Sequence, residues 1–247
     1  MIEDDILAHA LACAPAECCG LVVGDEYVRC RNVASAPESS FEIHPDDWSD
    51  CEDKGEITAV VHSHPGGVPF LSEADRIAQC RSGLPWWLVC DGAVHKFRCV
   101  PPLLGRKFEH GVMDCYTVMR DAYHLCGHDL PDFDRQDNWW ANGQDLYFEN
   151  MADGGFVRLG DDAEILPGDV FLMCLDLAGQ NVPKATHSAI YIGNQQILHQ
   201  RPNALSKRDV FGGFWQKITH STWRYQKWQK SDFTGILNDL AASSNSR

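Results

Sequence analysis

Two histidines and two carboxylates in the first third of the chain have the types and spacing to hold and use a metal ion. His62 and His64 lie two positions apart, and Asp75 follows eleven residues after His64. Two imidazoles and one carboxylate, with a fourth position left for water, are the ligands of a catalytic rather than a structural zinc site. Glu17 stands just before a short apolar run and is the candidate general base. These residues predict metal-dependent hydrolysis.

The segments around the histidines predict elements that would bring these groups together. The β-branched run in ITAVVHSHP predicts a buried strand, from which His62 and His64 project on the same face. Pro and Gly residues then force a loop, and a helix is predicted to open at Ser72 with Asp75 in its first turn. A capping box, S-x-x-D, explains Ser72 and Asp75 without a metal. Capping and ligation are compatible, so both interpretations stand.

Residues from about Glu3 to Cys99 resemble a JAMM (MPN-type) metallopeptidase domain. That family has a glutamate, then H-x-H-P, then S-x-x-D beginning seven residues after the proline. The pattern is met here without departure by Glu17, His62, Ser63, His64, Pro65, Ser72 and Asp75. The resemblance implies zinc on His62, His64 and Asp75, with Glu17 as acid/base and Ser72 steadying the tetrahedral intermediate. It also implies hydrolysis of an amide or isopeptide bond.

A second group of chemically competent residues lies in the rest of the chain. From Asp114 onward, apolar residues recur at helical spacing until Gly127, which places Cys115 at a helix N-terminus. Amide dipoles at a helix start favour the thiolate, so we expect a lowered pKa and a nucleophilic sulfur.

Two histidines are candidates for the base that such a cysteine needs. KATHSAIYIGNQQILHQ predicts a β-hairpin in which His187 starts one strand and His199 ends the next, so the two rings would be neighbours. His187 would pair with Cys115 while His199 orients His187. The alternative, a core thiol with two surface histidines at strand ends, is equally open from the pattern alone.

Residues from about Phe108 to Gln229 resemble an NlpC-like cysteine peptidase. The motifs are a G-x-x-D-C helix start, LPGDVFLM, H-x-A-I-Y-I-G and a following I-L-H, and they imply that Cys115, His187 and His199 form the triad. Tyr116 is a departure, because many members carry Ser there. Another is an insertion-like segment over 132–151, which leaves the shape of the cleft open. Four aromatic residues of this segment either line the cleft or are buried in the core. They are Trp139, Trp140, Tyr147 and Phe148.

Length and composition indicate a globular chain that is long enough for two domains of ordinary size. The 247 residues are 44% hydrophobic, and the net charge of −14 with an acidic run over 46–56 argues against a nucleic-acid partner. The acidic N-terminus does not fit a signal peptide, and no apolar stretch approaches membrane-spanning length. Eleven cysteines without paired spacing are expected to be free thiols.

The expected limits are a JAMM-like domain over 1–102, a linker over 103–107, an NlpC-like domain over 108–230 and a C-terminal tail over 231–247. The two resemblances imply an α+β fold in both domains, with a helix-flanked mixed sheet in the first. In the second we expect a papain-like arrangement, with an N-terminal helix on an antiparallel sheet.

The order of the two domains resembles the tail assembly proteins of long-tailed phages, of the lambda K type. This resemblance implies tail-tip proteins as partners and peptidoglycan stem peptides as the substrate of the cysteine domain. It implies a location in the host cytoplasm during tail assembly, or in the virion tail tip. Two other functions remain open: a structural tail component with little or no turnover, and a cytoplasmic metal-dependent isopeptidase whose C-terminal domain is a binding module.

Overall fold

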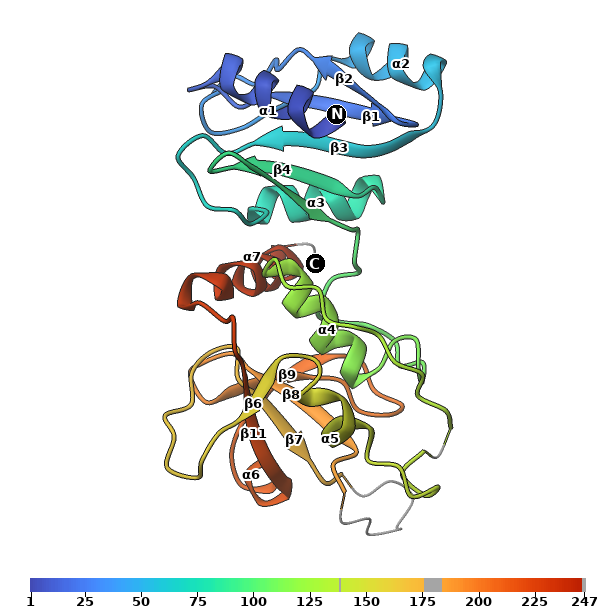
Figure 1. Ribbon diagram of the computed structural model, residues 1–247, viewed down its shortest axis with the longest axis vertical. Helices are drawn as coiled ribbons and strands as arrows, with labels where there is room; N and C mark the ends of the chain where they lie inside the picture. The colour runs from blue at the N-terminus through green and yellow to red at the C-terminus, as the bar shows by residue number, and fades with distance from the viewer. Residues whose placement is uncertain (138, 176–183, 246–247) are drawn as a thin grey trace. The chain divides into compact units, whose positions relative to one another are not determined.

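The computed structural model describes residues 1–137, 139–175 and 184–245. The chain divides into two compact units, residues 1–101 and residues 102–245, which are described separately (Figure 1). Both units combine helices with a sheet, which confirms the predicted α+β class.

The first unit is built on a mixed sheet of five strands in the order β2-β1-β3-β4-β5. Strands β3 and β4 are parallel, and the other neighbours are antiparallel. The strands are β1 (Cys19–Val23), β2 (Glu26–Cys30), β3 (Ile57–Ser63), β4 (Trp86–Cys90) and β5 (Ala93–Phe97). The helices are α1 (Ile2–Cys13), α2 (Pro45–Lys54) and α3 (Glu73–Ser82).

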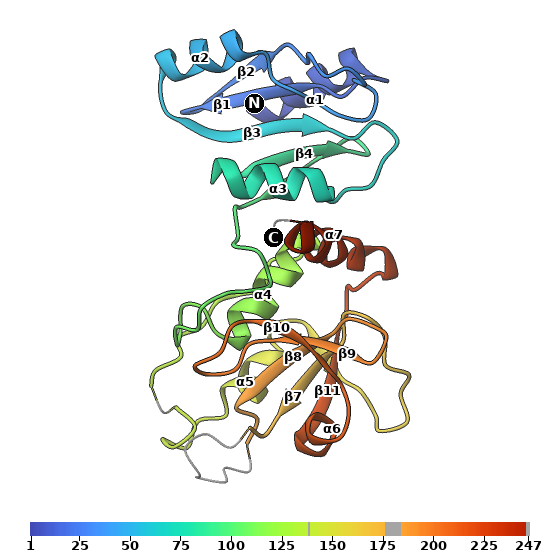
Figure 2. The same cartoon turned by 180° about the vertical axis from the view of Figure 1, so that it is seen from behind.

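Helices cover both faces of this sheet because its strands are apolar on both sides. Along β3, Ala59 and Val61 pack with Ile6 and Ala10 of α1. Val60, which points the other way, belongs to the core under α2 and α3 (Figure 2). His62 has the same parity as Val60, so it lies on the α2 and α3 face.

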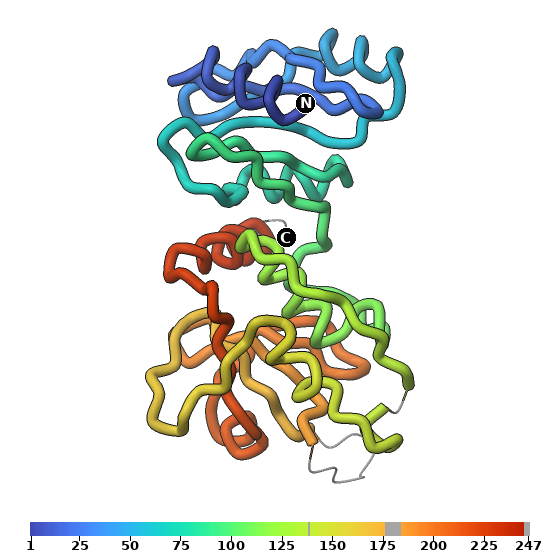
Figure 3. The backbone as a smooth tube through the Cα atoms, viewed as in Figure 1, coloured from blue at the N-terminus to red at the C-terminus, as the bar shows by residue number. Residues whose placement is uncertain are grey.

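The second unit has an antiparallel sheet of six strands in the order β10-β9-β8-β7-β11-β6. The path of the chain through it can be followed in Figure 3. The strands are β6 (Phe156–Arg158), β7 (Val170–Met173), β8 (His187–Tyr191), β9 (Gln196–His199), β10 (Lys207–Val210) and β11 (Thr219–Tyr225). The helices are α4 (Cys115–Leu125), α5 (Leu146–Met151), α6 (Phe214–Ile218), the 3-10 turn η1 (Lys230–Asp232) and α7 (Phe233–Asn245).

Helix α4 packs against β8 and β9, as the papain-like arrangement predicts. The predicted hairpin is formed by β8 and β9.

All eleven cysteines are free thiols. Among the described residues, no helix is long and apolar enough to cross a membrane.

The expected linker and tail both belong to the folded second unit. Within 103–107, Leu103 is buried and its backbone N–H donates to Asp239 Oδ2 at 2.8 Å. The guanidinium of Arg106 lies 2.7 Å from the buried Asp121 carboxylate of α4. Most of the expected tail over 231–247 is helix α7, which packs against α4 through buried residues such as Ile236. Pro101 and Pro102 indicated a break in the chain, but the partners of the residues that follow are too distant in sequence to be predicted.

The close packing of α7 on α4 predicts how a substitution at Gly235 changes the stability of the protein. A Cβ at this position would overlap the carbonyl oxygen of Leu125, at the end of α4. Gly→Ala inside a helix normally stabilises by up to about 1 kcal/mol. We expect Gly235→Ala to lower the free energy of unfolding instead, by about 1–3 kcal/mol, because the two helices must move apart.

Denaturant unfolding monitored by tryptophan fluorescence measures this change. Gly160→Ala is the matched control, since nothing lies within 4 Å of a Cβ there. A stabilised Gly235→Ala protein would contradict the close approach of α7 to α4.

Candidate active sites

The first candidate site forms where β1 and β3 run side by side. In their antiparallel register Cys19 pairs with His62, so Glu17 lies beside the His64 end of β3. Between the two histidines, Ser63 Oγ accepts a hydrogen bond from the backbone N–H of Cys18 at 2.8 Å. Strand pairing therefore brings the glutamate to the histidine pair across 45 residues of chain.

The three expected ligand atoms lie at nearly equal distances from one another. His62 Nε2 is 3.2 Å from His64 Nε2, and Asp75 Oδ2 is 3.4 Å from the first and 3.3 Å from the second. Ligands held tetrahedrally at about 2.0–2.1 Å from a zinc ion lie about 3.3–3.4 Å apart. The two nitrogens and the oxygen therefore fit three corners of a zinc tetrahedron.

Neighbouring groups fix the orientation of these ligands. The backbone carbonyl of Val68 lies 3.1 Å from His64 Nδ1 and accepts its hydrogen, so Nε2 is the nitrogen that faces the site. Asp75 Oδ2 also accepts from Ser72 N at 2.8 Å, while Ser72 Oγ accepts from Asp75 N at 3.1 Å. The predicted capping box is thus present, and it holds the carboxylate that faces the histidines.

Burial and charge shift the pKa values of these groups in different directions. Burial lowers the pKa of His62, whereas for His64 the Asp75 carboxylate outweighs burial and raises the pKa. Burial also opposes ionisation of Asp75, but hydrogen bonds from both imidazoles hold its pKa below the usual range. Burial raises the pKa of Glu17 to about 7, against the influence of His64. A carboxyl group with this pKa can accept and release a proton near neutrality.

Glu17, His64, Ser72 and Asp75 line one pocket of about 900 Å³. Much of the remaining wall is apolar, with three aromatic side chains: Phe41, Trp48 and Trp86. The His62 ring lies behind, stacked on Phe41 at a centroid distance of 4.7 Å. The site therefore opens onto a groove with room for a peptide segment.

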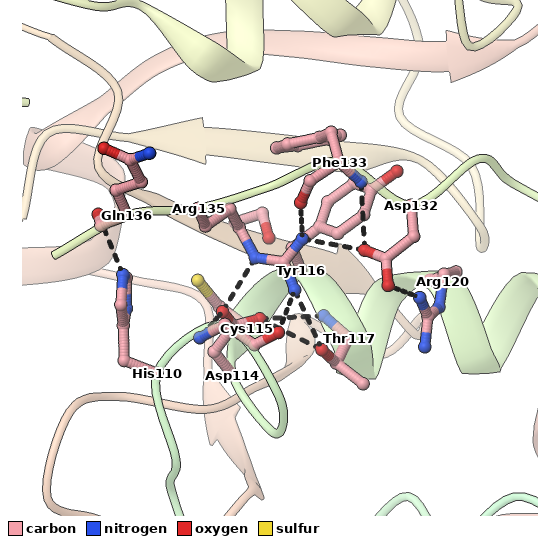
Figure 4. Close-up of polar contacts among 12 residues, drawn as sticks. His110, Asp114, Cys115, Tyr116, Thr117, Arg120, Asp132, Phe133, Arg135 and Gln136 are labelled. Atoms are coloured by element: carbon pink, nitrogen blue, oxygen red, sulfur yellow. Dashed lines mark hydrogen bonds and ion pairs between the residues drawn. The ribbon is translucent and has the colours of Figure 1, made fainter. Parts of the chain in front are cut away.

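The second candidate site begins at the start of α4. Asp114 is the N-cap residue, and its carboxylate accepts from Thr117 N at 3.0 Å and from Gly111 N at 2.9 Å. The Nε–H of Arg135 donates to the same carboxylate at 2.9 Å, and both side chains are 4% exposed. The contacts are drawn in Figure 4. Cys115 is the first helical residue, as the G-x-x-D-C motif predicts.

Arg135 comes from the insertion-like segment and anchors it to this helix start. Its guanidinium also donates to the carbonyl oxygens of Phe133 and Gly111, and it lies 4.9 Å from the centre of the Tyr116 ring (Figure 4). Tyr116, the departure from the family pattern, packs against Phe133 and donates its hydroxyl to Pro131 O. The larger ring at 116 therefore supports the inserted segment.

Cys115 has a different partner and a different pKa shift from those predicted. Its Sγ lies 3.1 Å from the Tyr147 hydroxyl, which donates to Ser188 Oγ at 3.0 Å. No hydrogen bond from Cys115 to His187 is found among the described residues. Burial, followed by the charge of Asp114, raises the pKa of the thiol. The predicted lowering was wrong for this state, because loss of solvation outweighs the helix dipole.

The histidines form a relay that is longer than the sequence predicted. His187 Nε2 lies 2.9 Å from His199 Nδ1, and His199 Nε2 lies 3.0 Å from Asp209 Oδ2 of β10. Burial holds the pKa of His187 far below its usual value, so this ring is neutral. Asp209 could not be predicted from the sequence, because β10, with the sequence KRDV, lacks the apolar alternation of a strand.

Cys115 and His187 line the same pocket, of about 470 Å³. Of the four aromatic residues proposed for the cleft, Trp139, Trp140 and Tyr147 line this pocket. Phe148 does not, because it packs edge-on against Trp223 and His220 instead. The insertion-like segment therefore forms one wall of the cleft.

Comparison with known proteins is consistent with both sites. A model of prokaryotic homologs of the JAB domain matches residues 2–100, and the NlpC/P60 family model matches residues 105–224. The chain is 56% identical over 202 residues to "Tail tip assembly protein K" of Escherichia phage lambda, covering 82% of this chain and 98% of that protein. The chain belongs to the tail tip assembly protein K family.

The counterpart in Escherichia phage N15 is 33% identical over 235 residues, covering 90% of this chain and 93% of that protein. The solved structure of NlpC1 from Trichomonas vaginalis is 20% identical, with a TM-score of 0.37, over 64% of this chain and 46% of that chain. A similarity of that size adds nothing to the assignment. The pairing of a JAMM-type domain with an NlpC-like domain is confirmed in this K family member, and NlpC/P60 is a family of cysteine peptidases.

The geometry of the first site predicts one zinc ion per chain. Elemental analysis of the K family chain should find about one zinc, and His62→Ala with His64→Ala should remove it, because a lone carboxylate binds zinc weakly. Glu17→Gln should keep the metal, because Glu17 is not among the three clustered ligand atoms. His95→Ala is the control for loss of a histidine elsewhere in the unit. Unchanged zinc in the double variant would place the metal elsewhere.

The raised pKa of Cys115 predicts slow alkylation at neutral pH. Since only the thiolate reacts, its rate should rise about tenfold per pH unit until the pH exceeds that pKa. At pH 7 brief iodoacetamide treatment should label the exposed Cys80 ahead of Cys115. Mass mapping of the labelled peptides reads this order directly. Cys115 leading at pH 7 would mean that the thiolate is stabilised in the resting protein.

Proposed function

We propose that this chain is a tail-tip assembly protein with two peptidase sites. Its cysteine domain hydrolyses amide bonds of peptidoglycan stem peptides, and its JAB-type domain hydrolyses a peptide or isopeptide bond. The names of both K relatives support the place in tail assembly, which makes tail proteins the expected partners. We further propose that the chain acts in the host cytoplasm during assembly or at the tail tip of the virion.

The observation that carries the cysteine peptidase function is the shared pocket of Cys115 and His187. His187 is neutral and its Nδ1 is buried without a partner among the described residues, so a lone pair is available to accept a proton. As Cys115 Sγ attacks the peptide carbonyl carbon, the thiol proton passes to His187. His187 then delivers this proton to the nitrogen of the breaking C–N bond, and the amine leaves.

Water completes the cycle at the resulting thioester. A water molecule attacks the acyl carbon and gives a proton to His187, and the C–S bond breaks as the proton returns to the sulfur. The raised pKa of Cys115 requires attack and proton transfer to be coupled, because little free thiolate is present beforehand.

The pocket lining carries exposed charges of both signs, Arg201 and Asp137, and Arg201 is the group that could bind a carboxylate of the substrate. Arg201 is exposed and lines the pocket near His187, whereas Arg135 is compensated by the buried Asp114 carboxylate. Stem peptides carry free carboxylates, and a guanidinium binds such a group in two parallel hydrogen bonds. Trp139 and Trp140 offer apolar surface for the adjoining side chains.

In the JAB-type domain, His62, His64 and Asp75 would hold zinc. When bound, zinc supplies Lewis-acid activation of a carbonyl group and of water. Glu17 lines the same pocket with a pKa of about 7, so its carboxylate can take a proton from the attacking water and pass it to the leaving amine. Ser72 Oγ, which is held by the cap of α3, can donate its hydrogen towards a developing oxyanion.

A structural tail component with little turnover is the second candidate. It is favoured by the contact of the Cys115 thiol with Tyr147 rather than with His187. Measured turnover on a muropeptide separates the two functions.

We predict a division of labour between the sites. In zymography of full-length protein on peptidoglycan, Cys115→Ala should lower wall cleavage by about 10³-fold or more, because the nucleophile is lost. His62→Ala and a chelator should leave it unchanged. The matched control is Cys80→Ala, which removes an exposed thiol remote from the pocket in sequence. If Cys115→Ala stays active while His62→Ala or the chelator abolishes cleavage, the metal site is the wall hydrolase.

A further inference from the structure

Beyond the two histidines of the second site lies a carboxylate that the family motifs do not include. Asp209 sits on β10, the edge strand next to β9, where Lys207 pairs with His199. Its Oδ2 is 3.0 Å from His199 Nε2, and its Oδ1 is 2.9 Å from Lys207 Nζ. The side chain is 23% exposed, whereas the His199 side chain is fully buried.

This carboxylate decides where the hydrogens of both imidazoles sit. An ionised carboxylate only accepts hydrogen bonds, so His199 Nε2 must carry a hydrogen. His199 Nδ1 is then the acceptor of the neutral ring, and His187 Nε2 must donate to it across 2.9 Å. That places the lone pair of His187 on Nδ1, which has no partner among the described residues.

We propose that Asp209 is a positioning residue that acts through His199 to keep the proton-accepting lone pair of His187 on Nδ1. The proposal rests on the proposed cysteine peptidase function, and it extends the Cys115, His187 and His199 set to a fourth member.

The surroundings of the two rings support this role for Asp209. Arg201 and Lys207 are the cations that act on the imidazoles, and both disfavour a positive charge there. Asp209 opposes them at His199, so it also stabilises the charge that the relay gains when His187 takes the Cys115 proton. The Trp215 ring packs 4.5 Å from His199 and 5.9 Å from His187 and limits rotation of both rings.

The test combines ring tautomers with kinetics on the full-length protein. Long-range nitrogen–proton NMR correlations report which imidazole nitrogen is protonated, with signals assigned from His187→Ala and His199→Ala. Wild type should show both rings protonated at Nε2, and Asp209→Ala should lose this pattern at His199 and, through the bond between the rings, at His187. On a defined muropeptide, Asp209→Ala should lower kcat by about 10- to 100-fold and leave KM within about twofold. This loss is smaller than the roughly 10⁴-fold loss seen when a carboxylate next to a catalytic histidine is replaced.

Two variants control for structural effects. Asp209→Asn keeps a hydrogen-bond acceptor without the charge and should fall between wild type and Asp209→Ala. Arg208→Ala changes the neighbouring exposed residue of β10 and should leave kcat and the tautomers unchanged. Loss of the Asp209 charge makes the two imidazoles less basic. The acid limb of the profile of kcat against pH should therefore move to lower pH.

The proposal is overturned if Asp209→Ala keeps the wild-type tautomers, or if it changes them without lowering kcat. If wild type fails to cleave any muropeptide, the proposed function fails. The tautomers of Asp209→Ala then still decide whether Asp209 positions the relay.

Discussion

The buried ion pair between Asp114 and Arg135 is the contact around which the cysteine site is arranged. One carboxylate caps α4, holds the turn at Gly111 and binds the guanidinium of the inserted segment. Taking both charges out of water is unfavourable, and removing one partner of such a pair typically destabilises by about 3–5 kcal/mol. The fold accepts this arrangement because it joins the cysteine helix to the segment that forms the aromatic wall. The pocket and its nucleophile are thus positioned by the same atoms.

The candidate zinc site is also positioned in advance by regular secondary structure. A strand end supplies two imidazoles, a helix cap supplies the carboxylate, and neither depends on a long side chain that must be ordered on binding. Ligand atoms that are fixed in advance lose little conformational entropy when a metal binds. Aromatic packing around His62 adds to this rigidity.

Much of the fold and of both sites could be predicted because the signals are local. The strand before His62, the helix starts at Ser72 and Cys115 and the hairpin carrying His187 and His199 are all marked by short runs of sequence. Contacts between distant segments were missed, among them Tyr147 with Cys115 and Leu103 with Asp239. No periodicity or capping signal encodes such pairs, since they depend on how elements pack.

The pKa of Cys115 shows how magnitude decides between two opposing effects. A helix N-terminus contributes about 0.3–1 kcal/mol, and up to about 2 kcal/mol in partly buried sites. Burial can shift a pKa by up to about 3–5 units, each worth about 1.36 kcal/mol, and Cys115, although only partly buried by surface exposure, has its pKa raised. The position of Cys115 at the helix start was readable from the sequence, whereas the surroundings of its sulfur depend on packing, including the contact with Tyr147 of the inserted segment.

The place of α7 in the chain determines when the second unit can complete its packing during synthesis. It follows every other element of the second unit in the order of translation, yet it packs on α4, which carries the cysteine at its other end. Domains form as units while the chain emerges N-terminal end first. The cysteine helix therefore gains its last packing surface only after the rest of the unit has left the ribosome.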